Sequence, residues 1–373
     1  MNKQLKIASI GPYLPFRGGI SDFHNDLVEQ LKISHNVEII NFRKLYPNFL
    51  FPGKSQTINK NLNSKKKSVR ILNPINIITW HKAIRFINKY NADVIIFSYW
   101  HPFFALMFSF IAKRINCKKI YFLMHNAQSH DQFPFEKFLV RKMLLNATHI
   151  VSMNDKELKK IESFKVQSKI LKSFHPIYIK KYNESDRFAF KKELGLNNNP
   201  VILFFGLIRP YKGLDILIKS VNLLKKSIPE LKVLIVGEPY MDMKKYFLKI
   251  QELGLKKFFI FDNHFVDDNK LKKYFLSSDL VVLPYKKSTQ SGVLSLSMNF
   301  NIPSIVSSNG GLKDYIINNK TGFISSLKPK DISSLIEQYF SKNLYKEFSI
   351  NIKEHKKIFT WDKFEKSLQL NDE

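Results

Sequence analysis

Short runs of apolar residues alternate along the chain with longer segments in which apolar residues recur every three or four positions. Apolar runs of roughly four to eight residues between turn residues are typical of buried strands, and the wider spacing is typical of helices with one apolar face. This alternation predicts a parallel sheet covered by helices. In the first half we predict strands at 6–10, 37–42, 94–99, 119–124 and 149–153, and helices at 20–31, 79–90, 103–114 and 135–145.

The second half repeats this pattern after a polar segment. We therefore predict an α/β protein with two Rossmann-like domains in series, residues 1–178 and residues 179–355. The link between them is expected within 174–187, where an apolar stretch ends and charged residues follow. Residues 53–70 are rich in Ser, Asn and Lys, which predicts a loop. The strands of the second half are predicted at 201–205, 232–236, 258–261, 280–284, 304–307 and 322–324.

The composition is that of a folded protein in a reducing compartment. The 373 residues are 44% hydrophobic, which excludes intrinsic disorder. The single cysteine, Cys117, excludes a disulfide framework and a cysteine-based zinc site, so we expect a cytoplasmic protein. The apolar run at 5–11 is too short for a signal peptide. The longer run at 94–112 is interrupted by Trp100 and Pro102, which favours a strand and a helix over a membrane span.

The chain carries an excess of positive charge, and most of it lies in the first half. The formal net charge is +29 at pH 7, and residues 1–180 contain 29 basic and 10 acidic side chains. Residues 39–92 contain eleven Lys or Arg and no acidic residue, with apolar side chains such as Ile78 and Trp80 among them. Three interpretations stay open: binding to nucleic acid, contact with an anionic membrane, and solvated lysine in a lysine-rich protein.

Two turns that contain glycine each follow a predicted strand and precede a predicted helix. The first has Gly18 and Gly19, and the second has Gly206, Arg209 and Lys212. Glycine lets backbone N–H groups approach a ligand closely, and a helix N-terminus favours anions. A guanidinium and an ammonium on one loop at the carboxyl edge of a sheet can hold two neighbouring phosphates. The first turn can equally be structural, and its spacing does not indicate a nicotinamide cofactor.

Two further turns of this kind occur in the second half. The third ends in Gln290, Ser291, Gly292 and Val293, and the fourth, at 307–314, contains two adjacent glycines. Small residues at the start of a helix leave backbone N–H groups able to bind an anion. Four such turns in two sheets exceed what packing requires, and together they predict a bound diphosphate compound.

Three segments of the second half resemble the glycosyltransferase family 4 group. They are G-x-x-R-P-x-K-G-x-D at 206–215, the stretch 278–293, and I-P-S-I-V-S-S-N-G-G-L-K-D at 302–314. The resemblance implies the GT-B architecture, with two facing Rossmann-like domains and a cleft between them. It also implies that a sugar-nucleotide donor binds mainly to the C-terminal domain and that the acceptor lies against the N-terminal one.

The resemblance further implies roles for single residues. His125 matches the family's active-site histidine near the transferred sugar, and Gly18 and Gly19 match the loop that closes on the donor. No cofactor or metal ion is implied, and the sugar would retain its anomeric configuration. Fixed cations suit this chemistry because the leaving nucleoside diphosphate gains negative charge as the glycosidic bond breaks. The second-half residues assigned to the donor are Gly206, Ser291, Gly292 and Val293, with Arg209 and Lys212 neutralising its diphosphate.

One feature departs from the family pattern. Many members carry two glutamates eight positions apart in the third turn, whereas residues 288–296 of this chain contain no acidic side chain. Leu296 stands where the second glutamate, which contacts the ribose, would be. We therefore expect Gln290, Glu238 or backbone groups to contact the sugar and the ribose instead.

The predicted function is transfer of a hexose-type sugar from a nucleotide-diphosphate sugar to a saccharide or polyprenyl-diphosphate-linked acceptor in surface polysaccharide synthesis. A non-hydrolysing sugar-nucleotide epimerase of similar fold is the alternative; a nucleic-acid-binding protein is a further one, but no nucleic-acid motif is present. The basic stretch suggests peripheral attachment to the inner face of the cell membrane, with Lys82, Arg85 and Lys89 along one helix. We expect residues 356–373 to pack back on the first domain.

Overall fold

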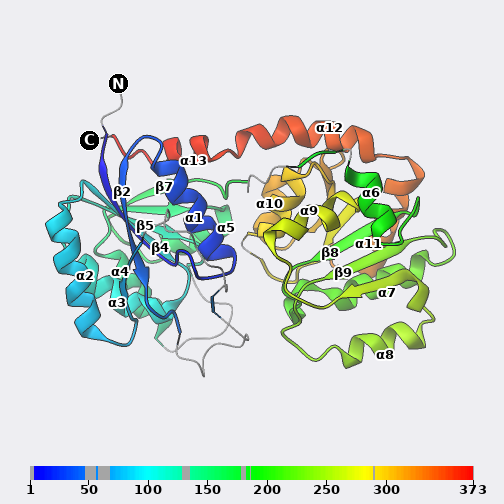
Figure 1. Cartoon of the computed structure of the whole chain (residues 1–373), viewed down its shortest axis with the longest axis horizontal. Helices are drawn as coiled ribbons and strands as arrows, with labels where there is room; N and C mark the ends of the chain where they lie inside the picture. Colours follow the sequence, from blue (N-terminus) through cyan, green and yellow to red (C-terminus); the bar gives the residue numbers. More distant parts are fainter. Residues whose placement is uncertain are drawn as a thin grey trace. The chain divides into compact units, whose positions relative to one another are not determined.

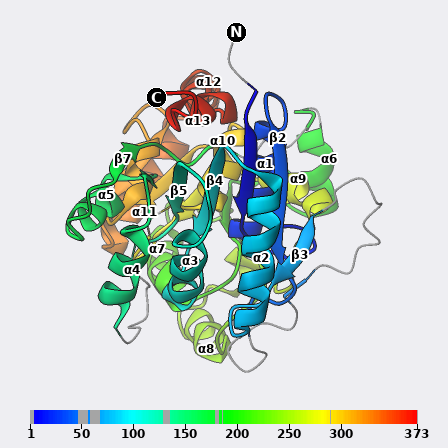
Figure 2. The same ribbon diagram turned by 90° about the vertical axis from the view of Figure 1, so that its left-hand side faces the viewer.

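The chain folds as two compact units, each built round one parallel sheet (Figures 1 and 2). Unit 1 comprises Met1–Pro176 and Phe359–Glu373, and unit 2 comprises Ile177–Ile358. The structure is a computed structural model, and it describes residues 4–46, 56–57, 68–127, 135–177, 182–184, 186–288 and 290–372.

Unit 1 contains a seven-stranded sheet with the order β3-β2-β1-β4-β5-β6-β7, in which all neighbouring strands are parallel. The order reverses between β1 and β4. In α/β sheets such a reversal marks the place where ligands commonly bind, beyond the carboxyl ends of the strands. The strands are β1 (Lys6–Ile10), β2 (Asn36–Phe42), β3 (Val69–Leu72), β4 (Val94–Tyr99), β5 (Lys119–Met124), β6 (His149–Ser152) and β7 (Lys169–Lys172).

The two faces of this sheet have separate cores because successive side chains of a strand point to opposite faces. On β4, Ile95 and Phe97 point into a core shared with α2, α3 and α4, whereas Val94 and Ile96 point into a core shared with α1 and α13. Figure 2 shows α2, α3 and α4 next to one another. The helices are α1 (Gly19–Leu31), α2 (Ile77–Tyr90), α3 (Ala105–Ala112), α4 (Glu136–Leu144), α5 (Asp155–Glu162) and α13 (Trp361–Ser367).

Helix α13 follows unit 2 along the chain but belongs to the core of unit 1. The ring centres of Trp361 and Phe364 lie 5.1 Å and 5.7 Å from that of Phe23 on α1. The side-chain amide of Gln30 donates a hydrogen bond to Glu365 over 2.7 Å. Residues after unit 2 therefore complete the apolar layer that covers one face of the first sheet.

Unit 2 contains a six-stranded parallel sheet with the order β10-β9-β8-β11-β12-β13, and its order reverses between β8 and β11. Its core combines buried residues of β8 and β9 with those of α7 and α11. The strands are β8 (Val201–Phe205), β9 (Lys232–Val236), β10 (Phe259–Asp262), β11 (Leu280–Leu283), β12 (Ser304–Ser307) and β13 (Gly322–Ser325). The helices are α6 (Asp186–Glu193), α7 (Leu214–Leu224), α8 (Lys244–Glu252), α9 (Asp268–Leu276), α10 (Gly292–Asn299), α11 (Pro329–Ser341) and α12 (Tyr345–His355).

The structure confirms the predicted strands and adds two, β3 and β7, that the sequence pattern does not indicate. The loop predicted at 53–70 is wrong at its end, because Val69 and Arg70 pair with β2 as part of β3; most of its remainder lies outside the described residues. Trp80 is buried in the core and does not contribute to a basic surface. Within the described parts of the chain, every helix is too short or too polar to cross a membrane.

Candidate functional site

The loops after β8 and β9 are hydrogen-bonded to each other at the carboxyl edge of the unit 2 sheet. The backbone N–H of Gly206 donates to the carbonyl oxygen of Val236, and that of Ile208 donates to the carbonyl oxygen of Glu238, each over 2.9 Å. These bonds extend the pairing of β8 and β9 beyond the strands. They bring Glu238 next to the segment that contains Arg209.

Glycines allow the loops after β8, β11 and β12 to touch. Gly213 has φ 76°, and a Cβ atom there would lie 2.1 Å from the carbonyl oxygen of Pro284. Gly310 has φ 111°, and a Cβ atom there would lie 2.0 Å from the carbonyl oxygen of Ser288. Any other residue would clash with backbone at either position, so only glycine fits. Three of the turns identified from the sequence thus meet at one edge of the sheet.

Lys212 lies inside this cluster of loops. Its side chain is 6% exposed, and its Nζ atom donates to the carbonyl oxygen of Phe205 over 3.1 Å. Gly206 leaves space for it, because a Cβ atom there would lie 2.8 Å from Nζ. Burial and the neighbouring Arg209 guanidinium lower the pKa of Lys212 to about 7. A bound anion would counter both effects, so the site favours a negatively charged ligand.

Arg209 is half-exposed and rests on an aromatic ring. Its guanidinium carbon lies 5.1 Å from the ring centre of Tyr240, which is within the range of a cation–π contact. Tyr240 follows β9, and its backbone N–H donates to the carbonyl oxygen of Ile208 over 2.9 Å. The ring is therefore anchored to the loop that carries Arg209. This contact restrains the guanidinium while leaving part of it accessible to a ligand.

Helix α10 begins beside the same residues. The hydroxyl of Ser291 accepts a hydrogen bond from the first turn, which caps the helix. The N–H groups of Gly292 and Val293 belong to that turn and have no partner within an α-helix. A side-chain methyl of Val293 lies 3.3 Å from where a Cβ atom of Gly206 would be. The helix N-terminus, Gly206 and Lys212 therefore converge, an arrangement suited to a phosphate group.

The residues expected to replace the family's glutamates occupy different surroundings. Leu296 is buried within α10, so this position contributes apolar packing. Gln290 is half-buried directly before the helix cap, and Glu238 is half-buried just beyond the end of β9. Contacts of Gln290 and Glu238 with a sugar or a ribose stay predictions.

In unit 1, Gly18 and Gly19 lie at the N-terminus of α1. Gly18 has φ 109°, a conformation that favours glycine. The carbonyl oxygen of Gly18 accepts a hydrogen bond from the N–H of Asp22 over 3.0 Å, which starts the helix. A Cβ atom on either glycine would meet no atom within 4 Å. Packing therefore does not require glycine at either position. Binding of the donor by Gly18 and Gly19 stays a prediction.

His125 follows β5 at the carboxyl edge of the unit 1 sheet and is 1% exposed. Its ring packs edge-on against Phe23, with the ring centres 4.7 Å apart. Burial, followed by the neighbouring His175 and His24, lowers the pKa of His125 well below its usual range. Its imidazole is therefore neutral at physiological pH. The predicted contact of His125 with the transferred sugar stays a prediction.

Sequence reasoning missed a side-chain cluster at the carboxyl end of β10. The Asp262 carboxylate accepts a hydrogen bond from the hydroxyl of Tyr274 and contacts the imidazole of His264. The ring centre of Tyr274 lies 6.5 Å from that of Phe205, the last residue of β8. The cluster is therefore linked by packing to the strand that precedes Gly206. Neither this cluster nor Tyr240 could be found from the sequence, because the position of each depends on which strands are neighbours in the sheet.

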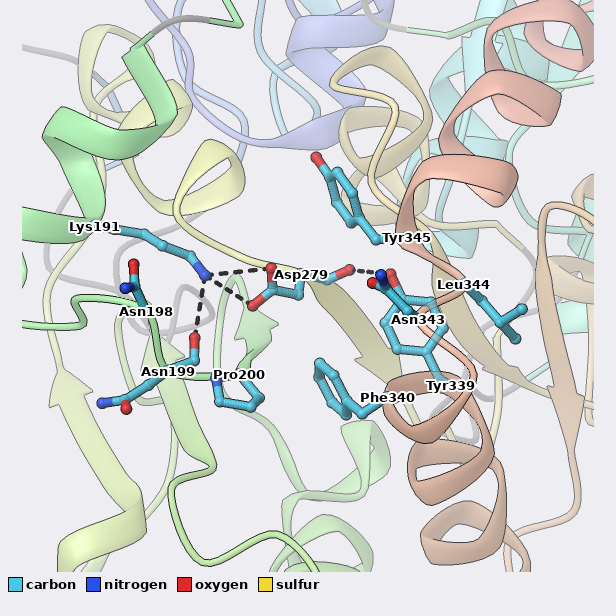
Figure 3. Close-up of a pocket in the computed structure, with 10 residues that line it drawn as sticks. All are labelled: Lys191, Asn198, Asn199, Pro200, Asp279, Tyr339, Phe340, Asn343, Leu344 and Tyr345. Atoms are coloured by element: carbon cyan, nitrogen blue, oxygen red, sulfur yellow. Dashed lines mark hydrogen bonds and ion pairs between the residues drawn. The ribbon is translucent and has the colours of Figure 1, made fainter.

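A cavity of about 170 Å³ lies at the opposite, amino edge of the unit 2 sheet (Figure 3). Asp279, directly before β11, accepts hydrogen bonds from the N–H of Val201 (2.7 Å) and from Lys191 (3.0 Å), and it pairs with Arg187. Its negative charge is neutralised within the fold, and these contacts fasten α6 to the sheet. The cavity is separate from the motif residues, so the candidate site is at the carboxyl edge.

The segment that forms this site matches a known protein family. Residues 186–355 match the family model described as glycosyl transferases group 1. Residues 186–355 form a glycosyltransferase group 1 domain. This range includes β8, α10 and every loop of unit 2 that contributes to the cluster round Lys212.

Curated relatives support the same assignment. An uncharacterized glycosyltransferase of Methanocaldococcus jannaschii is 27% identical over 187 residues, which is 48% of this chain and 47% of that protein. A GDP-mannose:glycolipid 4-beta-D-mannosyltransferase of Xanthomonas campestris pv. campestris is 29% identical over 121 residues, which is 31% of this chain and 33% of that protein. The chain thus matches about half the length of these curated relatives, or less.

Solved structures match the whole fold. The structure of Anabaena HepE in complex with UDP and glucose has a TM-score of 0.75 with 15% sequence identity, and the alignment covers 98% of both chains. At this identity the likeness establishes the fold. The chain has the GT-B fold, which confirms the predicted fold class.

Proposed function

We propose that the chain transfers a sugar from a nucleoside-diphosphate sugar to a saccharide or polyprenyl-diphosphate-linked acceptor during synthesis of a surface polysaccharide. The observation that carries the proposal is the convergence of Lys212, Gly206 and the N-terminus of α10, with Arg209 beside them. Two cations and backbone N–H groups that have no partner within their helix are complementary to a diphosphate.

The same arrangement supports catalysis of sugar transfer. When the glycosidic bond breaks, negative charge grows on the departing diphosphate, and groups that bind this charge stabilise the transition state more than the ground state. Lys212 is buried, so its charge acts in surroundings with little screening by water. In this proposal Arg209 and Lys212 supply the positive charge, no cofactor or metal ion takes part, and the sugar retains its anomeric configuration.

The names of similar proteins support the donor class. The Xanthomonas relative uses GDP-mannose and a glycolipid, and the HepE structure contains UDP and glucose. We propose a hexose as the transferred sugar and leave the base to experiment. Unit 1 is proposed to bind the acceptor. At the carboxyl edge of its sheet, Gly18 and Gly19 are proposed to close on the donor and His125 to lie near the transferred sugar.

Binding and turnover measurements test the proposal. Calorimetry with UDP, GDP and ADP should find at least one nucleoside diphosphate that binds, and the matching sugar nucleotide should lose its sugar to an added acceptor. Arg209→Ala and Lys212→Ala should each lower kcat/KM by about 10–100-fold, since a hydrogen bond to a charged group contributes about 1.5–3 kcal/mol. Lys249→Ala is the matched control, because this exposed lysine pairs with Glu252 on α8. Full activity in both site variants would contradict the assignment.

Interconversion of a free sugar nucleotide without an acceptor would instead favour an epimerase.

We further propose that the chain works in the cytoplasm, peripherally attached to the inner face of the cell membrane. The support is the basic character of unit 1, where Lys82, Arg85 and Lys89 are exposed along α2. Each Lys or Arg near an anionic bilayer contributes about 1 kcal/mol of attraction, so a few of them suffice for reversible binding. Sedimentation with anionic and neutral vesicles tests this location, and equal binding to both would contradict it.

A further inference from the structure

Exposed apolar side chains gather at the N-terminal ends of three consecutive helices of unit 1. Ile77 and Ile78 are the first two residues of α2 and are 49% and 62% exposed. Phe135 directly precedes α4 and Phe138 lies in its first turn, and they are 81% and 65% exposed. Two more side chains, Ile75 and Leu106, are exposed at the starts of α2 and α3. We call these six residues the apolar tip.

The apolar tip lies at one edge of the unit 1 sheet. In a parallel α/β sheet the connecting helices run opposite to the strands, so the N-termini of α2, α3 and α4 all lie at the carboxyl edge. Helix α3 packs against both α2 and α4, and the three helices cover the same face of the sheet (Figure 2). Residues that are separated by some sixty positions in the sequence therefore share one end of a layer of helices.

Positive charges lie along the same helices, both beside the tip and beyond it. Across residues 75–90, 102–114 and 135–145 there are eight Lys or Arg, all of them exposed, and one acidic residue, Glu136. We call these eight cations the basic flank. They are Lys82, Arg85, Lys89, Lys113, Arg114, Lys137, Arg141 and Lys142.

We infer that the apolar tip and the basic flank together bind an anionic lipid bilayer. Exposure of large isoleucine and phenylalanine side chains to water is energetically unfavourable. A cluster of such exposed side chains marks a surface at which a partner binds. An amphiphilic face with cations beside apolar groups matches a bilayer surface, where acyl chains accept the tip and anionic headgroups neutralise the flank. A nucleic acid would complement the flank but would leave the tip in water. The inference rests on the proposed peripheral location and names the surface responsible.

Binding of a bilayer at the apolar tip would bring the membrane close to the edge of the sheet proposed to bind the acceptor. The loops after β1 and β5, which carry Gly18 and His125, are at the same carboxyl edge as the apolar tip. A bilayer that receives the tip therefore lies close to the edge where ligands bind in α/β sheets. The surface thus favours an acceptor whose sugar or diphosphate group is anchored in the membrane by a lipid over one that is free in solution.

Sedimentation of the purified full chain with vesicles tests the apolar tip. Ile78→Ser/Phe138→Ser should lower the partition coefficient onto phosphatidylglycerol-containing vesicles by at least tenfold, since burying each apolar side chain contributes about 1.5–3 kcal/mol. Phe188→Ser/Ile350→Ser is the matched control, because these side chains of unit 2 are 71% and 56% exposed, and its partition should equal that of the wild type. Equal binding of the tip variant and the wild type would overturn the inference.

The basic flank is tested in the same assay. Lys82→Gln/Arg85→Gln/Lys89→Gln should lower binding about a hundredfold, at about 1 kcal/mol per charge, and should weaken its dependence on salt. The control carries the same three-charge change on unit 2, where the side chains are also exposed: Lys249→Gln/Lys353→Gln/Lys357→Gln. A control that loses as much binding as the flank variant would show that net charge alone matters and would overturn the named surface.

Further readouts separate failure of this surface from failure of the proposed function. Binding of UDP and GDP without vesicles should be the same in the wild type and in both variants, and melting temperatures should agree. Wild-type binding to vesicles with loss in the variants supports the surface even if no nucleotide binds. A random oligonucleotide that binds tightly and equally to the wild type and the tip variant, with no vesicle binding, would overturn the surface in favour of a nucleic acid.

Discussion

The ammonium group of Lys212 donates a hydrogen bond to the carbonyl oxygen of Phe205, 3.1 Å away, from a buried position. The lysine thus touches the last residue of the strand that precedes its own loop. Burial lowers the pKa of Lys212, and the nearby Arg209 lowers it further, to about 7. The buried positive charge of Lys212 destabilises the folded chain when no anion is bound, and it stabilises a bound anion. Two predictions follow from this.

Lys212→Met is expected to stabilise the protein while weakening donor binding. The pKa of Lys212 falls from 10.5 in the unfolded chain to about 7 in the folded one, so the unfolded chain binds the proton more tightly. The destabilisation is complete below pH 7 and disappears as the pH rises towards 10.5. Urea unfolding should therefore give Lys212→Met a higher free energy of unfolding than the wild type at pH 7, with a smaller difference at pH 9. A lower value at pH 7 would contradict the burial argument.

Donor binding should take up a proton near neutral pH. A diphosphate beside Lys212 raises the pKa of the ammonium, so affinity should fall by up to about tenfold per unit as the pH rises above 7 and should level off below it. Calorimetry in buffers with different ionisation enthalpies measures the proton uptake directly. Lys212→Met should show weaker binding without this uptake, which separates the lysine from titration of the phosphate itself.

Gly206→Ala should impair the site more than it impairs the fold. The added Cβ atom would lie 2.8 Å from the Nζ atom of Lys212 and would displace it, and φ 88° strains any other residue. We expect donor affinity to fall at least tenfold and stability to fall by about 1–2 kcal/mol. Gly195→Ala is the control for strain, since Gly195 has φ 67° and open space around it. It should lose similar stability and keep full donor affinity.

Tyr240 is expected to act on donor binding through Arg209. Tyr240→Leu removes the ring 5.1 Å from the guanidinium, which should weaken donor binding by a factor between about two and thirty, corresponding to a cation–π contact of about 0.5–2 kcal/mol. Tyr240→Phe keeps the ring and should bind as the wild type does. A double variant with Arg209→Ala should lose no more than Arg209→Ala alone. Additive losses would show that the ring acts independently of the arginine.

Acid should destabilise unit 1 through its buried histidines. Burial lowers the pKa of His24 and of His175 from 6.5 to about 4 each. The unfolded chain takes up these protons as the pH falls from 6.5 to 4 and the folded chain does not, so stability is full above pH 6.5 and is lost across that range. Between pH 7.5 and pH 5 the loss from the two histidines together should be on the order of 4 kcal/mol. Guanidinium unfolding followed at pH 7.5 and pH 5, with exposed His81→Gln as a control that leaves the loss unchanged, measures it.

The central strands could be predicted from sequence because they are buried on both faces and read as unbroken apolar runs, as at Val201–Phe205. The edge strands could not. In β3 and β7 only one residue each, Leu72 and Leu171, is buried, so four-residue segments with charged members carry little apolar signal. A helix was predicted at 103–114, where the structure has a short 3-10 turn followed by α3.

The candidate site divides in the same way. Gly206, Arg209 and Lys212 lie close together in sequence, so their turn could be recognised without the fold. The burial of Lys212 depends on packing from other strands, and so does the ring of Tyr240 beneath Arg209. The order of the strands in a parallel sheet decides which loops lie side by side, and the spacing of residues along the sequence does not specify that order.

Helix α13 makes the assembly of unit 1 depend on the order in which the chain is synthesised. Unit 2 is one continuous segment, Ile177–Ile358, and all of it leaves the ribosome before Trp361 and Phe364 do. Until then Phe23 and its neighbours on α1 lack part of their covering. Unit 1 should therefore be completed only after release from the ribosome, and a released chain truncated after residue 358 should keep a folded second unit and present a protease-sensitive first one.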